Sequence, residues 1–263
     1  MAAAYWHFLI GLKVLEGTPE GEDPGASCFR SFLGGVQGPD VFFYPGGERS
    51  FGEVTHGEGA FALAEAMKKA ARTPPEGAFA AGWRLHLLAD DVTHPLVDRW
   101  VCERFPRRCA CDPSRYPAGH HRVEWGIDLL LLGDDQAAVS LTAAAGALGT
   151  IVPLHGLVSS ALSSVCGRAP SPEEWRGSVE GMIKYLAIFR RSWRLTGFLG
   201  SKGVLKRALY VSLVLPLALA ATRKNPQLGV FIPVPPPGDA AAVVAAYTAE
   251  ACRLFRESER RFA

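Results

Sequence analysis

The stretch GWRLHLLADDVTHP, residues 82–95, carries two histidines and two aspartates in a segment that otherwise resembles a buried helix. His86, Asp90 and His94 are spaced four residues apart, so on a helix they lie on one face. Such groups are costly to bury without partners. The face therefore either meets water or holds a metal ion. Because Pro95 disfavours helical backbone at the residue before it, the helix is predicted to end at His94.

A second segment, AGHHRVEWGIDLLLL at residues 118–132, repeats the same spacing with His120, Glu124 and Asp128. An imidazole and a carboxylate one helical turn apart reach the same point, which is a chelating arrangement. The alternative is a helix start with a solvated Glu124. Two such patterns in one chain favour the metal interpretation. Asp128 lies among apolar residues and is predicted to accept a hydrogen bond from a ligand imidazole.

Three further residues are candidates for the same site. Asp40 follows a Gly-Pro pair, so it either caps local N–H groups or projects into the site as a ligand or base. His56 is predicted to start a helix. His7 lies on an apolar N-terminal helix, where a lone histidine is more often a core residue than a ligand. Of the seven histidines only His155 lies beyond residue 121, so any chemistry is expected in the first half of the chain.

Composition narrows the class of protein. The 263 residues are 48% hydrophobic and 21% charged, which provides enough apolar material for a sizeable core. The formal net charge of +2 is too weak for a typical binder of long nucleic acids. The N-terminus lacks the features of a signal peptide, and the longest apolar run, residues 208–221, is short and contains Pro216. The six cysteines form no C-x-x-C pair, so a cytoplasmic location is predicted.

Helical periodicity dominates and strand patterns are weak, which predicts an all-α, compact, multi-helix single domain over residues 1–263. The metal ligands are expected within residues 7–128, and helices in residues 135–263 are expected to complete the core. The predicted helices span residues 3–15, 28–35, 57–71, 78–93, 95–104, 119–132, 135–148, 151–165, 172–196, 203–221 and 239–261.

Two segments outside the histidine patterns have open interpretations. Residues 99–117 contain Cys102, Cys109 and Cys111 and form either a lid or a surface insertion, with room for one disulfide. Residues 183–197 mix basic and aromatic side chains, which suits peripheral membrane contact or the ordinary outer face of an amphipathic helix.

The order of these residues resembles the zinc-dependent phospholipase C family, whose zinc site is shared with the single-strand-specific nucleases. The resemblance covers about residues 5–132. Its most specific parts are H-x-x-x-D-x-x-T-H-P and H-x-x-x-E-x-x-x-D. The full series is His7, then Gly38-Pro39-Asp40, His56, His86-x-x-x-Asp90, His94 and His120-x-x-x-Glu124. The family is all-α, binds two or three zinc ions in a cleft and hydrolyses phosphodiester bonds.

The resemblance also implies a role for each residue. One zinc would take His56, His86 and Asp90. Asp90 would bridge to a neighbouring zinc that also takes His7. Another zinc would take His94, His120 and Glu124. Asp40 would bind zinc or accept the proton of the attacking water, so Asp40 and Asp90 are the catalytic candidates. Manganese or iron also suits such mixed ligands.

These features lead to one main functional expectation and two alternatives. The main expectation is a zinc-dependent phospholipase C-like hydrolase that acts on a small phosphodiester or a phospholipid. The first alternative is a single-strand nuclease or phosphatase on the same scaffold. The second is a non-catalytic metal-binding or membrane-interacting module. The sequence does not predict the oligomeric state.

Overall fold

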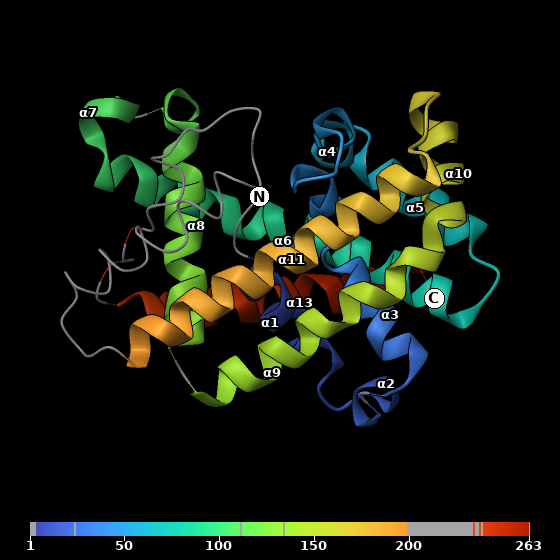
Figure 1. The fold of residues 1–263 in the computed structure, drawn as a ribbon, viewed down its shortest axis with the longest axis horizontal. Coiled ribbons are helices and arrows are strands. Elements are labelled where there is room, and N and C mark those ends of the chain that lie inside the picture. Colours follow the sequence, from blue (N-terminus) through green and yellow to red (C-terminus); the bar gives the residue numbers. More distant parts are fainter. Residues whose placement is uncertain are drawn as a thin grey trace.

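The computed structural model describes residues 4–23, 25–110, 112–133, 135–198, 234, 237 and 239–262, and this part of the chain is all-helical, without strands (Figure 1). It forms one compact domain, which confirms the predicted fold class. The elements are α1 (Ala4–Leu15), α2 (Pro19–Glu22), α3 (Ser27–Gly35), the 3₁₀ helix η1 (Pro39–Phe43), α4 (Arg49–His56), α5 (Ala60–Ala70), α6 (Pro74–Arg104), α7 (Pro106–Cys109), the 3₁₀ helix η2 (Pro113–Arg115), α8 (Pro117–Leu132), α9 (Asp135–Ala145), the 3₁₀ helix η3 (Gly146–Leu154), α10 (His155–Cys166), α11 (Pro172–Phe198) and α13 (Ala240–Phe262).

The long helix α6 is the element on which the histidine pattern of residues 82–95 lies. It begins with a capping box, in which the Thr73 hydroxyl accepts from the Glu76 N–H and the Glu76 carboxylate accepts from the Thr73 N–H. Its 31 residues correspond to a length of about 46 Å. The prediction that the helix ends at His94 was wrong, because α6 runs through Pro95 to Arg104 as one helix.

Helices α3 and α6 approach each other at two glycines. A Cβ added to Gly35 would lie 2.1 Å from the Phe79 carbonyl oxygen, and one added to Gly82 would lie 2.0 Å from the Phe32 carbonyl oxygen. Only glycine permits backbones to pack at this distance. The close approach brings Val36, just after α3, against the first histidine of the α6 pattern.

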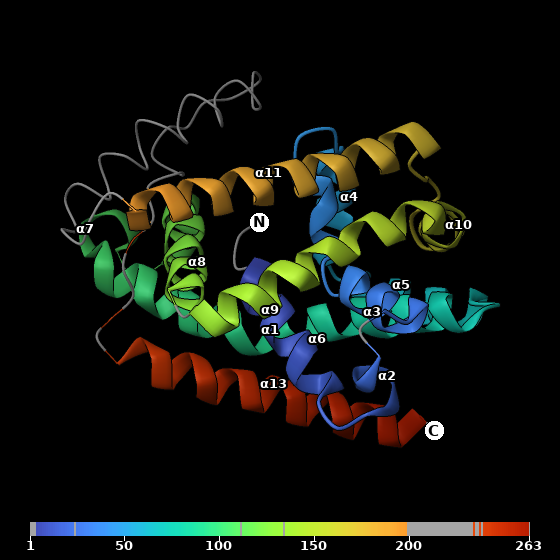
Figure 2. The same ribbon diagram turned by 60° about the horizontal axis from the view of Figure 1, so that its bottom comes forward.

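Helix α1 lies in the middle of the molecule, between α9 on one side and α13 on the other (Figure 2). Trp6 is buried and its indole N–H donates to the Thr248 hydroxyl of α13 at 2.9 Å. Asp128 of α8 accepts backbone N–H bonds from Tyr5 and Trp6 at 3.0 and 3.2 Å. Asp128 was predicted to accept a hydrogen bond from a ligand imidazole, but it instead accepts from N–H groups in the first turn of α1, which have no partner within the helix.

The second half of the chain contributes buried side chains to the same core. Trp175 of α11 is fully buried, and its indole N–H donates to the Ile151 carbonyl at 3.1 Å. The predicted helix at residues 203–221 lies outside the described residues. Within them, the run Val139–Cys166 is long and apolar enough to cross a membrane, but 39% of its most apolar window is buried, and core helices pass the same test.

The two segments with open interpretations, residues 99–117 and 183–197, are described only in part. Cys102 and Cys109 are free thiols on α6 and α7, and Cys111 lies outside the described residues. Phe189, in the basic segment at residues 183–197, is 1% exposed and packs edge-on against Trp125 with ring centroids 4.3 Å apart. This aromatic residue therefore belongs to the core and is not available to a membrane surface.

Candidate metal centre

The eight residues predicted as metal ligands meet in one place, although they come from five different elements. Seven of them line a cavity of about 200 Å³, together with Phe43 and His121. His86 lies behind this wall, with its Nε2 3.1 Å from the Nε2 of His56. The seven are His7, Asp40, His56, Asp90, His94, His120 and Glu124.

The first cluster comprises His56, His86, Asp40 and Asp90. The Nε2 of His86 lies 3.3 Å from Asp90 Oδ2 and 4.0 Å from Asp40 Oδ1. The Nε2 of His56 lies 3.3 Å from Asp40 Oδ1 and 3.7 Å from Asp90 Oδ2. The Nε2 atoms of His56 and His86 thus each lie within 4.0 Å of both carboxylates.

Backbone carbonyls fix the ring orientation in this cluster. His56 Nδ1 is 2.8 Å from the Gly52 carbonyl, and His86 Nδ1 is 2.8 Å from the Val36 carbonyl. Since a carbonyl oxygen only accepts, both Nδ1 atoms must carry the hydrogen. The two Nε2 atoms, 3.1 Å apart, then both carry lone pairs, which repel each other unless a cation lies between or beside them. That cation is either an extra proton or a metal ion.

The second cluster comprises His94 of α6 with His120 and Glu124 of α8. Glu124 Oε1 lies 3.2 Å from His120 Nε2 and 3.8 Å from His94 Nε2. Asp90 connects the clusters, since its Oδ1 is 3.2 Å from His94 Nε2. His121 contacts the other oxygen of Glu124, with its Nδ1 3.4 Å from Oε2.

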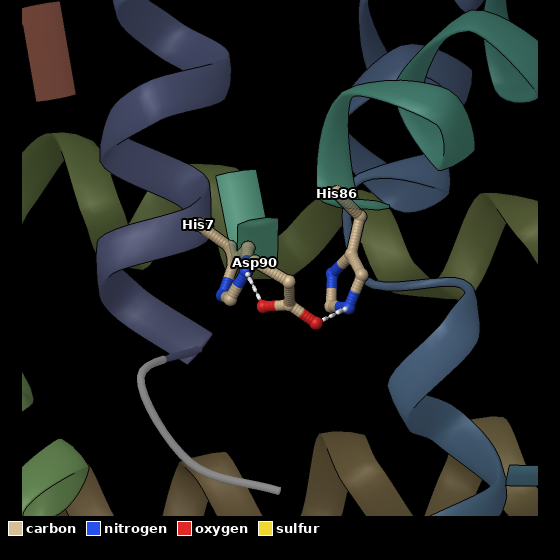
Figure 3. Close-up of side chains that lie close together, drawn as sticks. All are labelled: His7, His86 and Asp90. Carbon is tan, nitrogen blue, oxygen red and sulfur yellow. Dashed lines mark hydrogen bonds and ion pairs between the residues drawn. The ribbon is translucent and has the colours of Figure 1, made fainter. Parts of the chain in front are cut away.

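His7 approaches the site from α1. Its Nε2 lies 2.9 Å from Asp90 Oδ1, while Oδ2 of the same carboxylate faces His86 (Figure 3). The rings of His7 and His86 are stacked, with centroids 4.3 Å apart and planes inclined by 17°. The Asp90 carboxylate therefore contacts both rings, His7 through Oδ1 and His86 through Oδ2.

The electrostatics favour ionised carboxylates and a cation between them. Burial opposes charge on Asp90, but the imidazoles of His86 and His94 hold the pKa of its carboxyl well below its usual range. Burial lowers the pKa of His86, which favours its neutral form. Burial also opposes charge on His120, but Glu124 and Asp98 outweigh it and raise its pKa to about 10. Neutral imidazole and ionised carboxylate are the forms that bind metal, and a bound ion would displace the His120 proton.

Two features of the site were not predicted. His56 ends α4 and does not start the next helix, because residues 49–56, which no predicted helix included, form α4. Asp98 on α6 lies 2.9 Å from His120 Nδ1, where a carboxylate fixes the ring orientation and leaves Nε2 for a metal. Asp98 is four residues after His94, so the spacing would have revealed it had the helix not been predicted to end there.

The site opens toward solvent on the side of α5 and α6. His94 is 41% exposed, whereas His86 and Glu124 are buried. A larger groove of about 440 Å³ adjoins the cavity and shares His56, Asp90 and His94 with it. The ligand side chains are therefore within reach of a molecule in the groove.

Three groups in the described chain have ligand atoms close enough together to hold a metal ion, and they involve all eight predicted ligands. The groups are His7, His86 and Asp90; Asp40, His56 and His86; and His94, His120 and Glu124. No family model, no curated protein and no solved structure matches this chain. The geometry and chemistry of the site therefore carry the functional argument by themselves.

Proposed function

We propose that this protein is a metal-dependent phosphodiester hydrolase of phospholipase C type, with zinc as the metal. The observation that carries the proposal is the convergence of two histidine–carboxylate clusters on the single carboxylate of Asp90. Adjacent metal sites joined by one carboxylate suit the displacement of an alcohol from phosphorus, because both the attacking and the leaving oxygen need charge stabilisation.

The residues present fit zinc. The ligands are imidazole nitrogens and carboxylate oxygens without thiolate, and carbonyls orient two of the imidazoles. We assign Asp40, His56, His86 and Asp90 to one ion and His94, His120 and Glu124 to another. When bound, the ions would supply Lewis-acid stabilisation and a nucleophilic water at neutral pH.

The chain's own side chains then have distinct tasks. Asp90 links the two clusters, because its Oδ2 faces His86 of the first and its Oδ1 faces His94 of the second. Asp40 is 3% exposed and lies beside His56 and His86, where its carboxylate can accept the proton of the attacking water. Phe43 lines the cavity and gives it an apolar wall.

The groove next to the cavity favours a phospholipid or similar small diester over a nucleic acid. Its wall is partly apolar, through Ala60, Phe61, Leu87 and Pro95. None of its described lining residues is lysine or arginine. Besides the ligand Asp90, the carboxylates of Asp91 and Asp98 line the groove and would repel a string of phosphates. An apolar wall suits the fatty or aromatic part of a single diester.

The test combines metal analysis with an activity assay. Protein purified without chelators should contain zinc and should hydrolyse p-nitrophenyl-phosphocholine and phosphatidylcholine. Asp90→Asn should lower kcat/KM by roughly 100-fold or more, because losing a ligand costs at least as much as losing an outer partner of a ligand. His155→Gln is the control, since this histidine of α10 contacts the Pro170 carbonyl and is not among the residues that line the cavity or the groove.

Each of the other outcomes would contradict the proposed function in a different way. Cleavage of single-stranded oligonucleotides without cleavage of phosphatidylcholine would replace the proposal by a nuclease. Tightly bound metal with no hydrolysis of either substrate would indicate a binding module. Absence of bound metal after incubation with zinc would remove the basis of the proposal altogether.

A further inference from the structure

His86 belongs to two of the three groups that come close enough to hold an ion, but it has only one ring nitrogen to offer. Its Nδ1 donates to the Val36 carbonyl, so only Nε2 faces the site. A lone pair on nitrogen binds one ion at a time. The group with His7 and the group with His56 therefore compete for the same nitrogen, and the described ligands cannot complete all three.

Ring orientation decides between the two groups. An imidazole binds a metal in the plane of its ring, along the nitrogen lone pair, at about 2.0–2.1 Å for zinc. The rings of His7 and His86 are stacked with only 17° between their planes (Figure 3). Stacked rings stay roughly 3.5 Å apart, so an ion in the plane of one lies too far out of the plane of the other.

The other two histidine pairs have the opposite geometry. The rings of His56 and His86 are inclined by 76°, and those of His94 and His120 by 88°. In both pairs the Nε2 atoms face a shared carboxylate from different directions, so their lone pairs converge. These two pairs are built to share an ion, and the stacked pair is not.

We infer that the chain holds two metal ions and that His7 is a positioning residue for Asp90, not a metal ligand. This inference rests on the proposed metal-dependent function. His7 donates its Nε2 hydrogen to Asp90 Oδ1 at 2.9 Å and packs flat against His86. Both contacts hold the bridging carboxylate so that Oδ2 faces the first cluster and Oδ1 faces His94. The ligand role that the family resemblance implies for His7 is thereby replaced.

The number of ions per chain tests the inference directly. The protein is stripped of metal, titrated with zinc chloride and freed of excess zinc. The number of bound zinc ions per chain is then measured by inductively coupled plasma mass spectrometry. Wild type should bind two zinc ions per chain. His7→Gln, whose amide can still donate to Asp90, should also bind two, with affinity close to wild type. His7→Ala should retain two ions but bind them about 10- to 100-fold more weakly, as expected for a lost outer partner.

Two comparisons make the result decisive. His94→Ala should bind one ion, and the control His155→Gln should bind two. Three ions in wild type and two in His7→Gln would show that His7 is a ligand and overturn the inference. The wild-type count of three suffices for this even if a variant fails to fold. One ion in wild type would also overturn it while leaving a metal-dependent hydrolase, whereas no bound zinc would overturn the proposed function itself.

Discussion

At the scale of single residues, the site depends on partners behind the ligands as much as on the ligands. Asp98 faces His120 Nδ1, so the hydrogen on that nitrogen is fixed and Nε2 is directed to the second cluster. The Val36 and Gly52 carbonyls do the same for His86 and His56. Such partners set the tautomer and raise the basicity of the ligand, and their loss weakens metal binding.

Replacing Asp98 should therefore weaken the second metal site without changing the fold. We expect Asp98→Ala to lower zinc affinity at the cluster of His94, His120 and Glu124 by about 10- to 100-fold. Asp98→Asn keeps an acceptor for the ring N–H and should lose less. Competition with a chromophoric zinc chelator measures the affinity.

The matched control is Asp91→Ala, which removes a carboxylate from the same helix and the same groove. Within the described structure Asp91 has no hydrogen bond to a histidine, so only its long-range charge is lost. Equal weakening by both substitutions would show that net charge, and not the contact with His120, matters at this position.

At the scale of elements, the continuity of α6 makes one stripe of four site residues. His86, Asp90, His94 and Asp98 follow one another at intervals of four over about three turns. The helix persists through Pro95 because it is packed along its length, against α3, α5, α8 and α13. Tertiary packing outweighs the local cost of the proline, which is why local sequence rules placed the helix end too early.

The crossing of α3 and α6 should be the least tolerant point of this arrangement. Gly82→Ala would place a Cβ 2.0 Å from the Phe32 carbonyl oxygen, and neither backbone can yield easily. We expect a loss of about 3 kcal/mol or more in the free energy of unfolding, together with weaker zinc binding, because the Val36 carbonyl that orients His86 would move. Urea denaturation monitored by circular dichroism checks the first expectation.

Gly77→Ala is the control on the same helix, because a Cβ at Gly77 meets no atom within 4 Å. Alanine is preferred over glycine inside a helix, so this substitution should stabilise the protein by about 0.5–1 kcal/mol. If Gly82→Ala were as well tolerated as Gly77→Ala, the close backbone approach would not be a requirement of the fold.

At the scale of the whole molecule, a bound ion would join elements that are distant in sequence. The ligands come from η1, α4, α6 and α8, and three of their carboxylates are brought close together. Zinc should therefore stabilise the folded state relative to the unfolded chain, by about 2.7 kcal/mol at a free concentration 100 times the dissociation constant. Differential scanning calorimetry of stripped and zinc-loaded protein should show a Tm several degrees higher with zinc. An unchanged Tm would mean that zinc does not bind preferentially to the fold.

The parts of the molecule that could be predicted from the sequence are those set by local periodicity. Apolar spacing predicted most of the helices, and intervals of four predicted that His86 and Asp90, or His120 and Glu124, share a face. The parts that could not be predicted from the sequence depend on contacts between distant segments. Helix α4 contains Gly52 and Phe51 and has little helical preference of its own. The stacking of His7 on His86 follows from where α1 packs, which no spacing within α1 could reveal.

The hydrogen bond between Trp6 and Thr248 connects α1 to α13. Synthesis runs from the N-terminus to the C-terminus, so α1 emerges from the ribosome well before α13, the helix that packs on it. In the nascent chain, the histidines and carboxylates of the site are therefore present before the face of α1 that contacts α13 is covered. Stable binding of metal is therefore expected only after α13 has been synthesised, and a protein truncated before α13 should acquire its ions poorly.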